Sequence, residues 1–305
     1  MKRTILGPDG PEVTRLSYGA MRIAGSWDPN NVDREGAFAA LQAAYDAGYT
    51  LFDHADIYAR GACETLHGEF LRENPSLRNE TIIATKCGIR FGDEAAGVVG
   101  RYDFSPEWIL SSCDGSLSRL GIETIDLYQL HRPDLLMDPE LVAEAFATLE
   151  KAGKVRAFGV SNFLPSTVDL LKEFLPGTLL VNQIEVHLGR LDPFFDGTLD
   201  QCLRTGMTPL AWSPLGGGWI GAAIEDAPPE RQELLRKLDE VAGAHGVGRP
   251  EIALAWLMKH PSGIVPIVGS RVPERIKSMA RADEVELSRE EWYALLVAAR
   301  GKAMP

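Results

Sequence analysis

Four ionisable side chains fall at or just after the ends of consecutive apolar segments, where a buried site could use them. Asp53 ends one such segment and Tyr58 follows it by five residues, whereas Lys86 and His131 end the next two. The Lys86 ammonium stands in the apolar run IIATKC and needs a partner, which Asp53 could provide. A cation beside a phenol lowers the pKa of the phenol. Tyr58 is therefore predicted to be a general acid, and His131 a hydrogen-bond donor to a substrate oxygen.

Each of these residues has a structural interpretation when taken alone. Asp53 could cap a helix, Tyr58 could pack at a rim, Lys86 could lie at the surface, and His131 could be a hydrogen-bonded core histidine. Their joint occurrence on consecutive segments favours a proton-donating site.

The chain alternates short β-rich runs with longer amphipathic stretches. Strands are predicted over 15–20, 50–54, 81–87, 126–131, 155–160, 178–186, 207–212 and 263–269. Helices are predicted over 33–48, 105–121, 138–153, 165–174, 198–206, 229–246, 250–260, 273–282 and 288–300, several of them from an N-cap residue or a proline. This alternation predicts an α/β fold with a parallel sheet closed into a (β/α)8 TIM barrel. A doubly wound open sheet is the alternative, but its G-x-G-x-x-G signature does not follow the first strand.

Three segments are additional to the eight strand–helix units of the barrel. Residues 2–13 contain the turn GPDG and are predicted to form an N-terminal hairpin. A long loop with three consecutive glycines follows the seventh strand, and a C-terminal helix begins with the capping box at 288–291. Neither a linker nor a repeat interrupts residues 1–305, so one barrel domain is expected.

Composition restricts the partners. The formal net charge is −12 over 305 residues, without a basic block, which argues against nucleic acid and anionic membrane surfaces. No apolar run reaches the ~20 residues of a membrane span, and no secretory signal is visible at the N-terminus.

The four cysteines are scattered singly, which argues against a zinc site or a disulfide framework. His54 and Asp56 are a weak metal signal, so no metal is expected. We expect a cytoplasmic protein with a small-molecule partner.

Six motifs carry a resemblance to a known family. They are DHADIY at 53–58, TKC at 85–87, LHR at 130–132, GVSNF at 159–163, NQIE at 182–185 and PIVGS at 266–270. In order and position they resemble the aldo-keto reductase superfamily. The resemblance implies NADPH-dependent reduction of an aldehyde or ketone to an alcohol by hydride transfer. It also implies a catalytic tetrad of Asp53, Tyr58, Lys86 and His131.

The resemblance also implies the residues that hold NADPH (NADP+). Ser161, Asn162 and Gln183 match contacts to the nicotinamide carboxamide, and Trp212 matches an aromatic residue under its ring. The loop near the pyrophosphate is matched by Ser213, Pro214, Leu215, Gly216 and Gly217, and contacts to the 2′-phosphate by Ser270, Arg275 and, in support, Arg271. Gly19, Ala20 and Met21, at the end of the first strand and just beyond it, are also expected to contact the cofactor. Ser278-Met279 departs from the Glu-Asn pair that many members use to hold adenine.

Loop aromatics above the strand ends could line a substrate pocket, namely Trp27, Phe91, Tyr102, Phe163 and Trp219. Two other functions remain open. One is a lyase with Lys86 as a Schiff-base nucleophile, which an ion pair with Asp53 would oppose. The other is a regulatory subunit that binds NADPH with little turnover.

Overall fold

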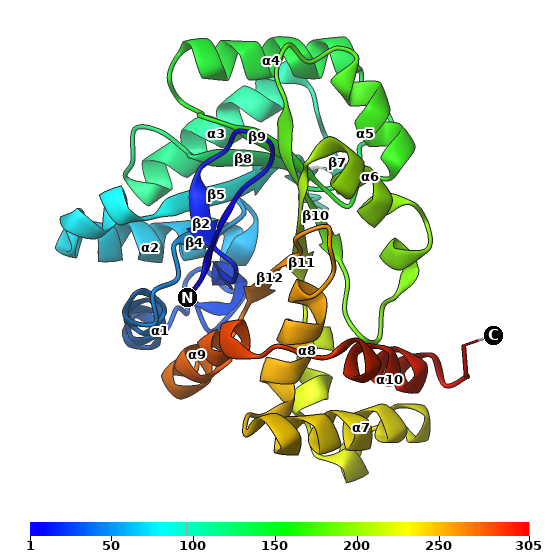
Figure 1. Ribbon diagram of the computed structural model, residues 1–305. Helices are drawn as coiled ribbons and strands as arrows, with labels where there is room; N and C mark the ends of the chain where they lie inside the picture. The colour runs from blue at the N-terminus through cyan, green and yellow to red at the C-terminus, as the bar shows by residue number, and fades with distance from the viewer. Residues whose placement is uncertain (96, 305) are drawn as a thin grey trace.

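The computed structural model of the chain describes residues 1–95 and 97–304 and contains a closed barrel of parallel strands (Figure 1). Around the ring the strands follow chain order, and the last pairs with the first. They are β3 (Ser17–Gly19), β4 (Leu51–Asp53), β5 (Ile82–Cys87), β8 (Leu127–Leu130), β9 (Phe158–Ser161), β10 (Leu179–Glu185), β11 (Thr208–Trp212) and β12 (Val265–Val268). Each falls within a predicted run, except that β9 extends one residue beyond 155–160, so the (β/α)8 barrel is confirmed and the doubly wound alternative is wrong.

The helices form the outer layer (Figure 1). Those at predicted positions are α1 (Arg34–Asp46), α3 (Pro106–Leu120), α4 (Pro139–Lys151), α5 (Pro165–Lys172), α6 (Thr198–Thr205), α7 (Pro229–His245), α8 (Arg249–Met258), α9 (Pro273–Met279) and α10 (Arg289–Arg300). The side chains of Asp33, Asp138 and Ser288 accept backbone N–H groups at the starts of α1, α4 and α10. Ser105, expected to cap α3, instead donates its hydroxyl to Asp103 Oδ1 at 2.7 Å.

One helix, α2 (Ala62–Glu73), was not predicted. It begins after a left-handed Gly61 (φ 92°) rather than after a capping side chain. Its buried face includes two polar residues, Glu64 and His67, beside Leu66 and Phe70. These buried polar side chains interrupt the apolar periodicity by which a helix is recognised in a sequence.

The N-terminal hairpin closes one end of the barrel. Its strands, β1 (Arg3–Ile5) and β2 (Glu12–Thr14), pair antiparallel and lie across the barrel in Figure 1. The Gly7 N–H donates to Thr208 Oγ1 and the Thr14 N–H to Thr50 Oγ1, both at 2.8 Å. Thr50 and Thr208 lie at the amino ends of their strands, so the carboxyl ends remain at the opposite, open end.

Two further connections complete the fold. Within 89–102, β6 (Ile89–Arg90) and β7 (Arg101–Tyr102) form a short antiparallel pair beside the open end.

In the outer helical layer, Trp256 of α8 and Trp292 of α10 stack with ring centroids 4.9 Å apart. Each indole N–H donates to the other residue's carbonyl, at 3.0 and 2.9 Å.

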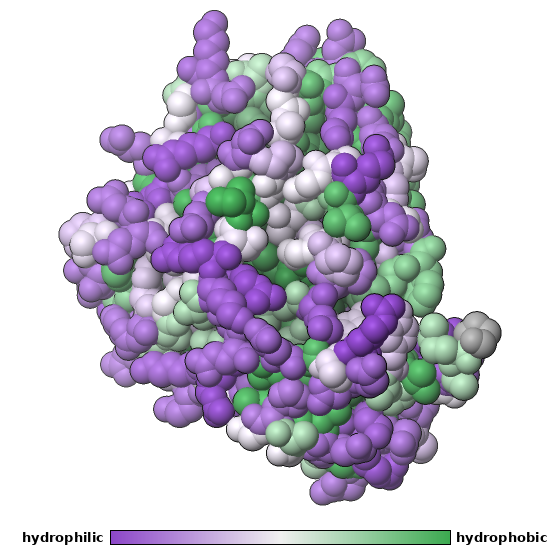
Figure 2. Space-filling model, viewed as in Figure 1, coloured by the Kyte–Doolittle hydropathy of each residue, from purple (hydrophilic) through white to green (hydrophobic). Residues whose placement is uncertain are grey.

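The barrel interior is apolar toward the hairpin, where Leu51, Leu127, Val181, Leu210 and Val265 meet in one buried cluster. The surface seen in Figure 2 is mainly hydrophilic. Among the described residues, no helix is both long and apolar enough to cross a membrane.

Candidate active site

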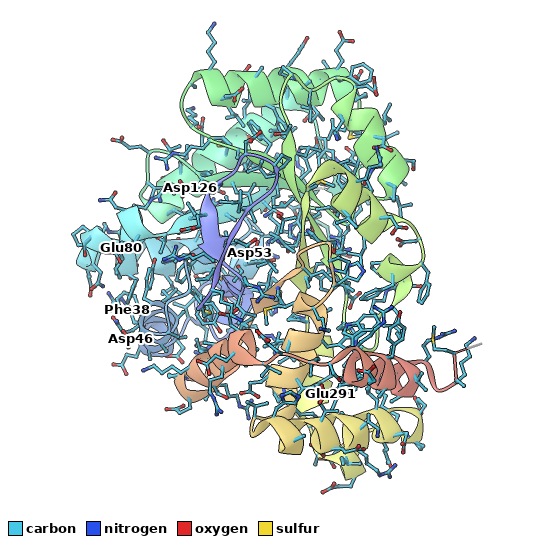
Figure 3. The ribbon with its side chains drawn as sticks, in the orientation of Figure 1. Phe38, Asp46, Asp53, Glu80, Asp126 and Glu291 are labelled. Carbon is cyan, nitrogen blue, oxygen red and sulfur yellow. The ribbon has the colours of Figure 1, made fainter. Side chains whose placement is uncertain are left out.

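The four ionisable residues meet at the carboxyl ends of β4, β5 and β8. Lys86 Nζ lies 2.7 Å from Asp53 Oδ2, 2.7 Å from the His54 carbonyl oxygen and 3.1 Å from Tyr58 Oη. Asp53 pairs with Ala84 across the two strands, two residues before Lys86, so strand register brings carboxylate and ammonium together. Figure 3 labels Asp53 within the ring of elements.

The Lys86 ammonium uses all three of its N–H donors on these three oxygens. Burial acts to lower the pKa of Lys86, but the Asp53 charge and the hydrogen bonds outweigh it, so the pKa is raised. Lys86 is therefore a charged donor. Because the Tyr58 oxygen accepts from Lys86, its own hydrogen is available elsewhere, and none of the described residues accepts it.

The pKa of Tyr58 differs from the sequence-based expectation. Burial raises it, the Lys86 charge lowers it and the Asp53 charge raises it again, with a net result above the ordinary value of 10.0. The expected net depression toward neutrality is therefore wrong for this structure, because removal of the phenolate from water outweighs the nearby cation. Tyr58 consequently remains protonated at neutral pH and keeps a proton to donate.

His131 lies beside Tyr58, with the two rings edge to face and their centroids 6.0 Å apart. Burial, then the Lys86 and Arg132 charges, lower the pKa of His131 well below its ordinary value. The imidazole is therefore neutral, with one N–H donor. Its Nδ1 atom has no hydrogen-bond partner among the described residues.

Polar side chains on β9, β10 and β11 join this centre in one network. Gln183 Nε2 donates to Asp53 Oδ1 at 2.8 Å, and Ser161 Oγ donates to the Gln183 carbonyl at 3.0 Å. Asn162 Nδ2 donates to Ser161 Oγ at 2.8 Å, and Trp212 Nε1 donates to Asn162 Oδ1 at 2.9 Å. The structure thus brings together four residues expected at the nicotinamide.

The loop after β11 runs through unusual backbone conformations. Ser213 has φ 49°, and Gly216 and Gly217 have φ 61° and 73°. A Cβ on Gly216 would lie 2.0 Å from Trp219 Nε1, whereas one on Gly217 would meet no atom within 4 Å. Gly217 therefore leaves the backbone open to close approach by a ligand. Pro214 and Leu215 connect Ser213 to this glycine turn.

The segment after β3 lies on the neighbouring side. Gly19 ends β3, and a Cβ there would lie 2.7 Å from Ile267 Cγ2, so the glycine is needed for packing. A 3-10 turn over Ala20–Arg22 follows, in which Ala20 is buried and Met21 is exposed.

Only one of the two arginines expected at the 2′-phosphate is available. Arg271 forms an ion pair with Asp33, with 2.5 Å between Nη2 and Oδ2. Arg275 is exposed and has no carboxylate partner among the described residues. The Ser270 carbonyl accepts the Tyr18 hydroxyl at 3.0 Å, and Ser270 Oγ accepts the Val272 N–H at 3.1 Å.

The loop aromatics do not all face the open end. Trp27, Phe91 and Tyr102 are 58%, 43% and 43% exposed, and Trp219 is half-buried against His187. Phe163 is 1% exposed and stacks on Phe104 within the core behind β9. The prediction that Phe163 lines a pocket is therefore wrong, because its ring belongs to the strand–helix layer.

Glu64 and His67, two buried residues near the site, were overlooked in the sequence. Behind Lys86, the buried Glu64 accepts Thr85 Oγ1 at 2.5 Å and Arg119 Nε at 2.7 Å. Burial, followed by the Glu64 charge, raises the pKa of Asp56 to about 7. His54 Nε2 lies 2.7 Å from His67 Nδ1, and His67 Nε2 lies 3.0 Å from the Tyr45 hydroxyl. Recognition of α2 would have supplied the signal, since both Glu64 and His67 lie on it.

Two hollows occur toward the hairpin end, with volumes of about 420 and 960 Å³. Neither is lined by Asp53, Tyr58, Lys86 or His131. The candidate site is therefore identified by its ionisable residues and their hydrogen bonds, and not by the size of a cavity. Among the described residues, no group of three or more His, Cys, Asp or Glu side chains could hold a metal ion.

The closed barrel thus holds a buried Lys–Asp pair and a tyrosine at the carboxyl ends of its strands. The sequence model of the Aldo/keto reductase family matches residues 15–297, and the chain belongs to that family. It is 41% identical to 6-dehydroglucose reductase of Novosphingobium aromaticivorans, over 98% of this chain and 96% of that one. It is 37% identical to the oxidoreductase YdhF of Escherichia coli over the full length of both chains. The solved glycerol dehydrogenase of Gluconobacter oxydans superposes with a TM-score of 0.86 at 25% identity, over 99% of this chain and 97% of that one.

Proposed function

We propose that this protein is a cytoplasmic, NADPH-dependent enzyme that reduces an aldehyde or ketone to an alcohol in a single barrel domain. The observation that carries the proposal is the Tyr58 hydroxyl. It accepts a hydrogen bond from the Lys86 ammonium, whose other two N–H groups donate to Asp53 and the His54 carbonyl. Its own proton stays available at the open end of the barrel.

The residues at the open end fit a nicotinamide dinucleotide. The Asn162–Trp212 hydrogen bond would fix the indole as a flat surface for the nicotinamide ring. Gly217 leaves space where a Cβ would otherwise stand, as approach of a pyrophosphate requires. Arg275, which is exposed and has no carboxylate partner among the described residues, would bind a 2′-phosphate. When bound, NADPH would supply the hydride for the carbonyl carbon.

The chain supplies the proton and the positioning. The His131 N–H and the Tyr58 O–H would hold the carbonyl oxygen from two sides, and Tyr58 would donate its proton to that oxygen. The phenolate left on Tyr58 would then be stabilised by the Lys86 ammonium 3.1 Å away. Asp53, held by Gln183 on its other oxygen, keeps Lys86 charged.

The same geometry opposes a Schiff-base lyase. A nucleophilic amine needs a free lone pair, whereas the Lys86 nitrogen is protonated and donates to three oxygens. A regulatory subunit without turnover would not require the Tyr58 proton, so removal of that proton distinguishes the two functions.

Tyr58→Phe is the central test. The substitution removes one hydroxyl and little volume, so NADPH should bind with near-normal affinity. Reduction of 4-nitrobenzaldehyde should fall by roughly 10²–10⁴-fold, as expected for loss of a positioned general acid. Lys86→Met should cause a comparable loss, and the double variant should not be additive, because both residues serve one proton transfer.

The measurement is single-turnover oxidation of NADPH, with cofactor affinity followed by tryptophan fluorescence. Tyr293→Phe on α10, remote from the open end, is the control and should keep wild-type rates. Retained reduction by Tyr58→Phe would transfer the acid role to His131. A wild-type protein that binds NADPH but reduces no aldehyde, ketone or quinone would instead favour the regulatory function.

A further inference from the structure

Two arginines flank the candidate acid and its neighbour. Arg60 follows Tyr58 by two residues in the loop after β4, and Arg132 directly follows His131 at the end of β8. Tyr58 and His131 lie edge to face with their ring centroids 6.0 Å apart, so Arg60 and Arg132 belong to the two loops that carry the expected carbonyl-binding residues.

Both guanidinium groups rest on aromatic rings rather than on carboxylates. Arg60 Cζ lies 4.7 Å from the Phe91 ring centroid, and Arg132 Cζ lies 5.4 Å from that of Trp212. Neither forms an ion pair within the part of the chain that the structure describes. Stacking supports the guanidinium plane while its N–H edge stays free for a planar oxyanion.

Several other arginines near this end pair with a carboxylate. Arg271 pairs with Asp33, and Arg90 and Arg101 share Asp103. Arg60 and Arg132 lack such a partner among the described residues, as does Arg275, in a chain whose net charge is −12.

The nearby carboxylates do not reach these two arginines. Asp134 accepts the backbone N–H groups of Phe104 and Leu136, and Asp53 is committed to Lys86 and Gln183. Arg231 stacks on Trp219, whose neighbour His187 lies 3.6 Å from Glu185, so a negative charge is present on that side.

The backbone at Arg60 is a second, independent observation. Ala59 and Arg60 have φ of 47° and 53°, a left-handed conformation that glycine adopts without strain. A long cationic side chain at this position does not relieve the strain, and its exposure shows that it does not fill the core. Strain retained at a site's edge points to a use for the side chain.

We propose that the carbonyl substrate of this enzyme carries an anionic group, of the carboxylate type, which Arg60 and Arg132 bind. The inference rests on the proposed carbonyl reduction and specifies its substrate class. Charge attraction to the two arginines would orient the carbonyl toward Tyr58 and His131 and favour such a substrate over neutral analogues.

The test compares 4-carboxybenzaldehyde with methyl 4-formylbenzoate, the same aldehyde with its charge masked. The wild-type protein should favour the carboxylate in kcat/KM by about tenfold or more, and added salt should reduce that preference. Arg60→Gln and Arg132→Gln should each lower the carboxylate-to-ester ratio by several-fold to tenfold. The matched control is Arg289→Gln, which removes an arginine stacked on Tyr293 in α10 at 5.2 Å and should leave the ratio unchanged.

Each outcome decides the inference. Ester and carboxylate reduced equally by the wild type, or a ratio unchanged in both variants, would overturn the anion site while carbonyl reduction itself stands. If neither aldehyde is reduced, calorimetric binding of benzoate and benzamide decides instead. Stronger binding of benzoate that is lost in both variants supports the site, and equal binding overturns it. A raised dissociation constant for NADPH in Arg132→Gln, without a change in the ratio, would place Arg132 at the cofactor and overturn its assignment to the substrate.

Discussion

Lys86 is the charged residue at the centre of the candidate site, where it donates to Asp53, the His54 carbonyl and Tyr58. A lysine within an apolar run requires a counterion, and Asp53 was predicted to be that partner. The carbonyl of His54, the third acceptor, was not predictable, because any backbone could have supplied it. The direction of the Tyr58 pKa shift was also misjudged, since burial is a property of the packed molecule and not of neighbouring residues.

At the residue scale, Arg275→Ala should weaken NADPH binding much more than NADH binding. Arg275 is exposed and unpaired among the described residues, whereas Arg271 is held by Asp33. A charge-assisted hydrogen bond to phosphate contributes about 1.5–3 kcal/mol, which corresponds to a tenfold or greater change in affinity. Fluorescence titration with each cofactor measures it. Equal losses for both cofactors would place the 2′-phosphate elsewhere.

At the element scale, α2 places side chains behind β4 and β5 that determine the surroundings of Lys86. His67 on α2 hydrogen-bonds His54, whose carbonyl accepts from Lys86, and continues to Tyr45 on α1. Burial, followed by the Arg78 charge, lowers the pKa of His67 to about 3. Burial, followed by the His67 and Lys86 charges, lowers the pKa of His54 well below its ordinary value.

These buried neutral histidines predict loss of stability in mild acid. Below pH ~6.5 the unfolded chain protonates His67 but the folded protein does not, so the free energy of unfolding falls as pH falls. For His67 the loss between pH 7 and pH 5 is about 2 kcal/mol, with a further contribution from His54. Urea unfolding of wild type and His67→Gln at both pH values is the measurement. A His67→Gln variant with an undiminished pH dependence would contradict the assignment, provided that the urea m-values remain equal.

At the scale of the whole molecule, α8 and α10 are joined by the reciprocal hydrogen bonds of Trp256 and Trp292. Trp256 is fully buried, so this contact secures the C-terminal helix against the barrel's outer layer. The segment before α10 also contacts the N-terminal hairpin region, because Asp283 pairs with Arg15 and Glu286 with Lys2.

Trp256→Ala should therefore lower the free energy of unfolding by about 3–5 kcal/mol, the cost of a large cavity plus lost hydrogen bonds. Chemical denaturation monitored by circular dichroism measures the change. Trp27→Ala is the matched control, because Trp27 is 58% exposed and its removal should change stability by less than about 0.5 kcal/mol. Similar midpoints for Trp256→Ala and the wild type would show that α10 is held by other contacts.

The sequence by itself determined the alternation of elements, the closed parallel barrel, and which polar residues end the strands, because periodicity and strand order are local patterns with few global solutions. Tertiary structure alone decided the surroundings of those residues. It placed Phe163 in the core, tied Arg271 to Asp33, raised rather than lowered the pKa of Tyr58, and brought α2 behind Lys86. Burial and charge pairing depend on segments far apart in the chain, so no local pattern contains them.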